Sequence, residues 1–140
     1  MSDFRFNRLI EIKEKLLEQK ERDLEVVLAS QAAVVEEMGR VDAASAGVYA
    51  EMANRLLTGK ELSMLTDQLA YLDWKRDRLH KEKEEWERKA ALLRKVLLSL
   101  EMELKVFEKL RFRARKTMEK VRNRKEQKMF DELALRSQER

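Results

Sequence analysis

The chain has 140 residues, of which 41% are charged and 44% hydrophobic, with no proline, no cysteine and three glycines. This balance is typical of long helices and coiled coils, and the lack of cysteine excludes a disulfide framework and thiolate metal sites. The net charge of +4 and the isoelectric point of about 9.3 give a mild bias toward acidic partners.

The first residues, Met1 to Phe6, lack a basic segment followed by an apolar one, as a secretion signal would have. No apolar run approaches the ~18 residues that a membrane span needs. We therefore expect a cytoplasmic protein whose association with a membrane, if any, is peripheral.

The first half of the chain carries a heptad pattern of apolar residues. Sustained over seven heptads, this pattern predicts a coiled-coil helix over about residues 3–56. Its a positions are Ile10, Leu17, Leu24, Gln31, Met38, Ser45 and Met52, and its d positions are Phe6, Lys13, Lys20, Val27, Val34, Val41 and Val48.

The second half repeats the pattern in a different register, which predicts a second helix over about residues 60–137. Between the two registers lies Leu57-Thr58-Gly59-Lys60, where Gly59 interrupts both periodicity and helix propensity, so we expect the turn there. The d positions are Leu65, Leu72, Leu79, Trp86, Leu93, Leu100, Phe107, Ala114 and Val121, and the a positions are Leu62, Leu69, Arg76, Lys83, Ala90, Leu97, Leu104, Arg111 and Met118.

The two registers fit an antiparallel pair. An a residue of one helix then faces a d residue of the other, as Ile10 with Phe107 and Met52 with Leu65, and the numbers of every such pair sum to 117. Each charged seam residue meets an uncharged one, so its aliphatic stem can cover the seam while its head reaches water. A parallel homodimer of one continuous helix would instead stack Arg76, Lys83 and Arg111 on their own copies.

We therefore predict an all-α fold: one domain spanning residues 1–140, built as a long antiparallel two-helix coiled-coil hairpin with an overhanging C-terminal helix. Because Phe6 would face Arg111, residues 112–140 would have no partner in the first helix. A lone helix of this kind is marginal in water unless a partner covers it.

The overhang is strongly basic. Residues 109–128 contain ten Lys or Arg and only two Glu, a net charge of +8. The run is either a docking arm for an acidic surface or a solvated helical end, and the apolar residues that continue through it, such as Met118 and Val121, favour docking. Nucleic acid is a rival ligand. However, the basic run follows the seam instead of preceding it, there is no aromatic platform for bases, and the run ends in the acidic-apolar segment Phe130-Asp131-Glu132-Leu133.

The region around the turn is rich in apolar and aromatic residues, including Tyr49, Leu56, Met64 and Tyr71, which either mark a contact surface or merely flank the seam. Chemistry is not indicated elsewhere. His80 is the only histidine, Gly59-Lys60 lacks the rest of a phosphate loop, and an extended hairpin has no pocket for catalysis. We expect no enzyme activity, cofactor, metal or small-molecule substrate.

Both ends of the chain resemble the FliJ family of flagellar export proteins. The opening Phe4-Arg5-Phe6-Asn7-Arg8-Leu9-Ile10-Glu11-Ile12-Lys13 and the closing stretch from Lys125 to Arg136, with Phe130-Asp131-Glu132-Leu133-Ala134, carry the resemblance. It implies a component of the flagellar type III export apparatus that is similar in shape to the central stalk of rotary ATPases. The partners it implies are the hexameric export ATPase FliI, the export gate protein FlhA and export chaperones, at the inner face of the cell membrane.

The resemblance also implies which residues meet these partners. The export gate would meet the tip through Tyr49, Leu65, Leu69, Tyr71 and Leu72, although Gln68 and Lys75 replace the small or aromatic residues of other members. The ATPase ring would meet Phe6, Arg111, Arg113, Arg115, Lys116, Lys120, Arg122, Arg124, Lys125, Phe130, Asp131, Glu132 and Leu133. The alternatives are a nucleic-acid-binding coiled coil, a scaffold that dimerises beyond Phe107, and the stalk of a virulence type III secretion system.

Overall fold

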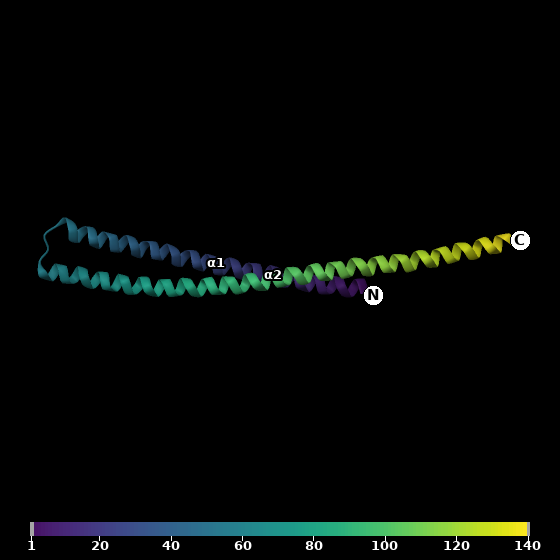
Figure 1. The fold of residues 1–140 in the computed structure, drawn as a ribbon, viewed down its shortest axis with the longest axis horizontal. Helices are drawn as coiled ribbons and strands as arrows, with labels where there is room; N and C mark the ends of the chain where they lie inside the picture. The colour runs from purple at the N-terminus through teal and green to yellow at the C-terminus, as the bar shows by residue number, and fades with distance from the viewer. Residues whose placement is uncertain (1, 140) are drawn as a thin grey trace. The chain divides into compact units, whose positions relative to one another are not determined.

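The computed structural model describes residues 2–139 and consists of two long helices that pack against each other (Figure 1). Helix α1 runs from Ser2 to Asn54 and helix α2 from Gly59 to Gln138. No strand occurs among the described residues. The structure therefore confirms the predicted all-α hairpin, and the expected end of the overhang at Arg140 lies outside the described residues.

The chain divides into two compact units, which are described separately. Unit 1 comprises residues 1–19 and 97–140, and unit 2 comprises residues 20–96. In unit 2, α1 and α2 run antiparallel and are joined by residues 55–58 (Figure 1). In unit 1, the start of α1 lies beside the middle of α2.

The core of unit 2 lies on the predicted heptad seam. Val27, Val34, Val41 and Val48, which are the last four d positions of α1, are all buried. Val41 and Val48 form one cluster with Leu65 and Leu72 of α2, and this cluster is covered by Met52, Leu57, Leu69 and Leu79. Each apolar side chain that is fully buried contributes roughly 1.5–3 kcal/mol, so this seam holds the two helices of the unit together.

The core of unit 1 is shorter. Ile10 of α1 and Leu100 and Leu104 of α2 are buried, and Phe6, Leu17 and Phe107 are half-buried beside them. Nη1 of Arg111 donates to Oδ1 of Asn7 at 2.9 Å, which agrees with the expected pairing of Arg111 with Phe6. The register predicted from the sequence is thus present in this unit.

The charged residues on the seam do not simply extend into water, because four of them reach carboxylates. In unit 1, Nζ of Lys13 lies 2.7 Å from Oε2 of Glu103, a close ion contact without good hydrogen-bond direction. In unit 2, Arg76 contacts Asp42 at 3.3 Å. Lys20 and Lys83 reach Asp23 and Glu87 on their own helices at 3.8 Å. These contacts neutralise charge at the seam, although exposed pairs are individually worth little.

The turn differs from the prediction at Gly59. This glycine is the first residue of α2, has no positive φ, and has open space where a Cβ would lie. Thr58 is the N-cap: its Oγ1 accepts from the backbone N–H of Glu61 at 3.2 Å, and its carbonyl accepts from the N–H of Leu62 at 3.0 Å. Thr58 and Glu61 form the T-x-x-E pattern of a helix start, which is the stronger local signal. The cap therefore fixes the start of α2, and Gly59 lies inside the helix.

Candidate functional site

The first candidate surface is the end of α2 in unit 1, residues 112–139, which we call the basic arm. Ala114 is still half-buried, but every described side chain from Arg115 onward is exposed. The described contacts of α1 with α2 in this unit extend to Arg111. From Lys116 to Glu139 the described side chains are exposed, so this part of the arm is a single helix.

Positive charge dominates the arm and its root. The ten Lys and Arg of residues 109–128 lie on a helix with only Glu119 and Glu126 among them. Nζ of Lys116 lies 4.7 Å from the ring centre of Phe112, so the two side chains form a cation–π contact. So much like charge on one helix produces a strong positive potential that attracts acidic surfaces.

An apolar stripe runs along the same arm. Met118, Val121, Met129 and Leu133 are 43–62% exposed and recur at spacings that keep them on one side of the helix. Phe130 lies next to the stripe and is 67% exposed. Exposed apolar side chains aligned in this way on a charged helix are typical of a surface that another protein covers.

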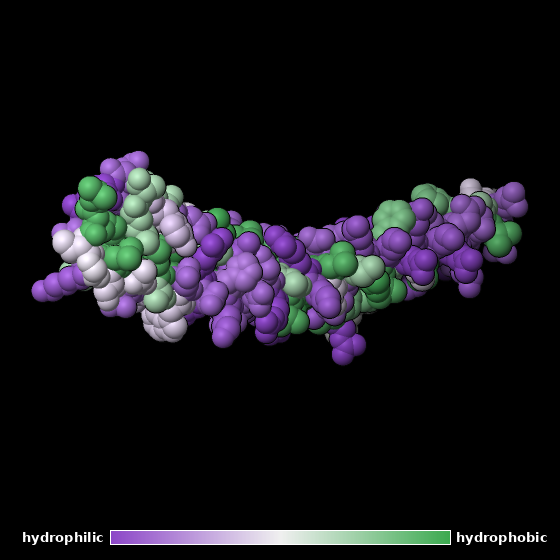
Figure 2. Space-filling model, turned by 60° about the vertical axis from the view of Figure 1, so that its left-hand side comes forward, coloured by the Kyte–Doolittle hydropathy of each residue, from purple (hydrophilic) through white to green (hydrophobic). Residues whose placement is uncertain are grey.

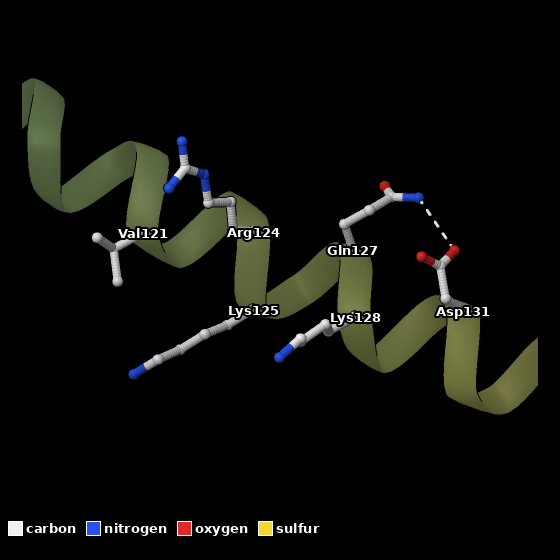
Figure 3. Close-up of a pocket in the computed structure, with 6 residues that line it drawn as sticks. All are labelled: Val121, Arg124, Lys125, Gln127, Lys128 and Asp131. Atoms are coloured by element: carbon white, nitrogen blue, oxygen red, sulfur yellow. Dashed lines mark hydrogen bonds between the residues drawn. The ribbon is translucent and has the colours of Figure 1, made fainter.

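An open hollow lies beside this stripe (Figure 3). It is lined by Val121, Arg124, Lys125, Gln127, Lys128 and Asp131. In Figure 3 the side chain of Gln127 points toward Asp131, and its Nε2 donates to Oδ1 of that residue at 3.2 Å. All six residues come from one helix, so the hollow is a surface depression suited to side chains of a partner and not an enclosed ligand pocket.

The residues predicted to meet an ATPase ring fall into two groups. Phe6 and Arg111 are half-buried in the paired part of unit 1. The others are exposed on the basic arm: Arg113, Arg115, Lys116, Lys120, Arg122, Arg124, Lys125, Phe130, Asp131, Glu132 and Leu133.

The second candidate surface is the tip of unit 2, the part of α1 and α2 near the turn. Leu65 and Leu72, predicted to meet the export gate, are buried in the core, and Leu69 packs against it. These three leucines hold the tip together and have little surface to offer. Tyr49 and Tyr71 are 60% and 56% exposed, so they remain available for contact.

At the tip, Tyr71 belongs to a group of exposed side chains that we call the aromatic cluster: Tyr71, Trp74 and Arg78. The sequence reasoning missed Trp74 and Arg78. The ring centres of Tyr71 and Trp74 are 6.0 Å apart, and the guanidinium carbon of Arg78 lies 5.4 Å from the Trp74 ring centre. Trp74 is 55% exposed. The spacing of three and four residues places them on one outward side of α2, and this spacing was the available signal. In Figure 2 apolar side chains gather at the end of the molecule that is turned forward.

An ion pair between the helices lies beside this cluster. Nζ of Lys75 is 3.0 Å from Oε1 of Glu37, and Nη1 of Arg40 donates to Oε2 of the same carboxylate at 3.0 Å. The hydrogen bond from Lys75, and then that from Arg40, lowers the pKa of Glu37. The bond to Glu37 raises the pKa of Lys75. Lys75 therefore joins the two helices of unit 2.

Among residues 2–139, no group of His, Cys, Asp and Glu side chains is suited to hold a metal ion. No helix in this part of the chain is long and apolar enough to cross a membrane.

The fold and the two exposed surfaces define a helical coiled-coil protein with surfaces suited to protein partners. A family model described as flagellar FliJ protein matches residues 1–140. The chain therefore belongs to the FliJ family, a non-catalytic component of flagellar protein export. No curated protein and no solved structure matches it.

Proposed function

We propose that the protein acts as the stalk of the flagellar export apparatus, binding and stimulating the hexameric export ATPase FliI with its basic arm. The observation that carries this proposal is the arm itself, a single helix with an exposed apolar stripe and a net charge of +8 around it. Membership of the family places the protein in flagellar export, where an ATPase is the partner that the resemblance implies.

The two features of the arm would act at different stages of binding. Its cations steer the helix toward an acidic surface and set the rate of association. The apolar stripe of Met118, Val121, Met129 and Leu133 then becomes buried, which holds the complex together. A single helix bound along the axis of a ring gives all subunits a shared partner and so promotes ring assembly and turnover. Hydrolysis of ATP takes place in the ring.

Charge reversal in the arm tests this proposal. The triple variant R113E/R122E/R124E changes the charge of exposed residues by six units, and we expect it to abolish stimulation of the ATPase. A matched control, K81E/R88E/K95E, makes the same change on exposed positions of α2 in unit 2. With this control, stimulation of the ATPase should stay within about twofold of that by the unchanged chain, because exposed charges outside the interface contribute little. Equal loss in both variants, or full stimulation by the first, would refute a role for the arm.

We further propose that the aromatic cluster, together with Tyr49, contacts the export gate protein FlhA. Tyr, Trp and Arg are the residues that most often dominate binding energy at protein interfaces, and here all three occur side by side and exposed. The core positions of Leu65, Leu69 and Leu72 give these leucines an indirect role, which is to keep the cluster in place.

Two single substitutions separate the gate contact from the ATPase contact. W74A should weaken binding to the gate about thirtyfold, the effect of losing an interface residue worth ~2 kcal/mol, and should leave ATPase stimulation unchanged. F130A removes a similarly exposed aromatic ring from the basic arm. It should weaken binding to the ATPase and leave binding to the gate unchanged. Titration calorimetry with each purified partner measures both. If W74A binds the gate normally, the cluster is not the contact.

The proposal includes handling of export chaperones and a position in the cytoplasm, peripheral to the inner face of the cell membrane at the flagellar base. Both follow from the family resemblance. They are tested by co-purification with chaperones and by locating a fluorescent fusion in cells that lack the export gate, where the peripheral signal should disappear.

A further inference from the structure

The paired part of unit 1 has two sides, and on only one of them is the row of residues next to the seam apolar. Leu9 and Leu16 precede seam positions of α1 by one residue, as Leu110 does on α2. In an antiparallel pair such positions lie on the same side of both helices. The contact of Lys13 with Glu103, seven residues before Leu110, shows the two helices meeting on this side. We call it the apolar side; its apolar residues are Leu9, Ile12, Leu16, Val106 and Leu110.

These side chains form the walls and rims of a groove. Leu9 and Leu110, next to the seam, are 36% and 38% exposed, and Leu16 is half-buried. Ile12 and Val106, one row further out, are 53% and 55% exposed. A hollow on this side is lined by Leu9 and Ile12 together with Phe4, Arg5 and Arg8. The exposure thus increases from the seam outward, as it does where a third helix could lie between two others.

Charge is distributed unequally between the two sides. Arg5 and Arg113 lie in the same outer row as Ile12 and Val106, and Arg8, Lys15 and Lys109 lie in the next row, opposite the seam. The one carboxylate of the apolar side is Glu103, next to the seam, which Lys13 already contacts. The opposite side of the same segment carries one cation, Lys105, and five carboxylates: Glu11, Glu14, Glu18, Glu101 and Glu108.

We propose that the apolar side of unit 1 is a docking groove for one acidic amphipathic helix of another protein, which completes a three-helix bundle. The apolar row of such a helix would fill the space between Leu9 and Leu110 and cover Ile12 and Val106. Its flanking Asp and Glu would lie against the cations of both rims. A chain with basic flanks, or a second copy of this protein, would bring like charges together there.

A flat anionic membrane fits the groove less well than a helix does. It would touch the outer residues Ile12 and Val106 and leave Leu9, Leu16 and Leu110, which are recessed beside the seam, without a partner. A helix reaches both rows because its side chains insert between those of the two helices. The observations therefore favour a helical partner.

This inference goes beyond the proposed function, because it concerns the paired helices and not the basic arm or the tip. Its test contains no ATPase and no gate protein. Failure of either proposal therefore leaves the other intact.

The probe is a fluorescent peptide of about four heptads with Leu at a and d and Glu at e and g. A twin peptide has Lys in place of every Glu. Binding to the full chain is followed by fluorescence anisotropy. We expect the acidic peptide to bind and the basic twin to bind at least about tenfold more weakly. The variant I12S/V106S should lower the affinity for the acidic peptide about tenfold or more, because two apolar contacts are lost.

Two variants serve as controls. L98S/F112S removes two exposed apolar residues, 57% and 60% accessible, from the opposite side, and should bind within about twofold of the unchanged chain. M118S/V121S removes the stripe of the basic arm and should do the same. Circular dichroism checks that each variant stays helical, since Ile and Ser have similar helix propensities.

Four results would overturn the proposal. One is equal binding of both peptides, and another is equal loss of binding in I12S/V106S and L98S/F112S. A loss confined to M118S/V121S would place the peptide on the basic arm. The fourth would be no peptide binding while anionic vesicles, or a second copy in sedimentation, bind in a manner that requires Ile12 and Val106; the surface would then serve a membrane or a dimer.

Discussion

The seam of unit 2 and the basic arm of unit 1 show that one heptad pattern can have opposite consequences. In unit 2 the pattern places Val41 and Leu72 in a core, where they are 3% and 8% exposed. In the arm the same helix, α2, continues the pattern through Met118 and Val121, yet these residues are 58% and 43% exposed. The difference is the presence of α1. Apolar periodicity predicts that a helix needs cover, but only the length of the opposite helix tells whether the chain provides it.

The largest expected difference between the two regions is in local stability. Amides of the seam helices in unit 2, such as those near Val41, should open only with global unfolding, which costs about 5 kcal/mol or more. Amides of the arm beyond Arg115 should exchange with opening free energies of about 0–2 kcal/mol, because a lone helix is marginal in water. Hydrogen exchange by mass spectrometry measures both. Equal protection would mean that the arm is already covered in the free protein.

Truncation of one side chain in each region sharpens the comparison. L72A should destabilise the protein by about 2–5 kcal/mol, since it removes a buried leucine and leaves a cavity. M118A should cost less than about 0.5 kcal/mol, because the side chain is exposed and alanine favours helix. Urea unfolding followed at 222 nm gives both values. A similar cost for the two variants would contradict the assignment of seam and arm.

A smaller effect is expected at the turn. T58A removes the hydroxyl that accepts from the N–H of Glu61 and should cost about 1 kcal/mol. G59A should be neutral or slightly stabilising, since the position is helical and open. The same unfolding assay applies. A larger loss in G59A than in T58A would show that the glycine, and not the cap, makes the turn.

The smallest effect concerns the ion pair of unit 2 and its dependence on pH. The pKa of Glu37 is lowered from 4.5. The contribution of its carboxylate to the stability of the fold is therefore complete above pH 4.5 and is lost as the pH falls through the lowered pKa. The pKa of Lys75 is raised from 10.5. The contribution of its ammonium group to the stability of the fold is therefore complete below pH 10.5 and is lost as the pH rises through the raised pKa.

The difference in melting temperature between the unchanged chain and E37Q should therefore be constant from about pH 5 to 10 and shrink at both extremes. E36Q is a fitting control, because the neighbouring Glu36 contacts only Arg40 among the described ion pairs. A difference that varied within the neutral range would point to another titrating group.

Most of the fold was predictable because its two determinants, seam and register, are periodic. The pairing of Ile10 with Phe107 and the burial of the valines at d positions follow from spacing alone. The error at Gly59 arose because glycine was given more weight than the T-x-x-E cap beside it. Of the candidate sites, the arm was predictable from charge and from the unequal helix lengths. The core positions of Leu65 and Leu72 were implied by the same seam, whereas the aromatic cluster lies on an outward side that the seam pattern does not describe.

The fixed pairing of α1 with α2 has a consequence for changes in chain length. A deletion or insertion in α1 shifts every layer on one side of it, so the seam is restored only when α2 changes by the same number of residues at the facing position. Whole heptads are the natural unit of such paired changes. The described part of the basic arm from Lys116 onward is exposed and is free of this coupling. In relatives of this chain, the paired helices should therefore vary in length together, in steps of seven, while the arm varies alone.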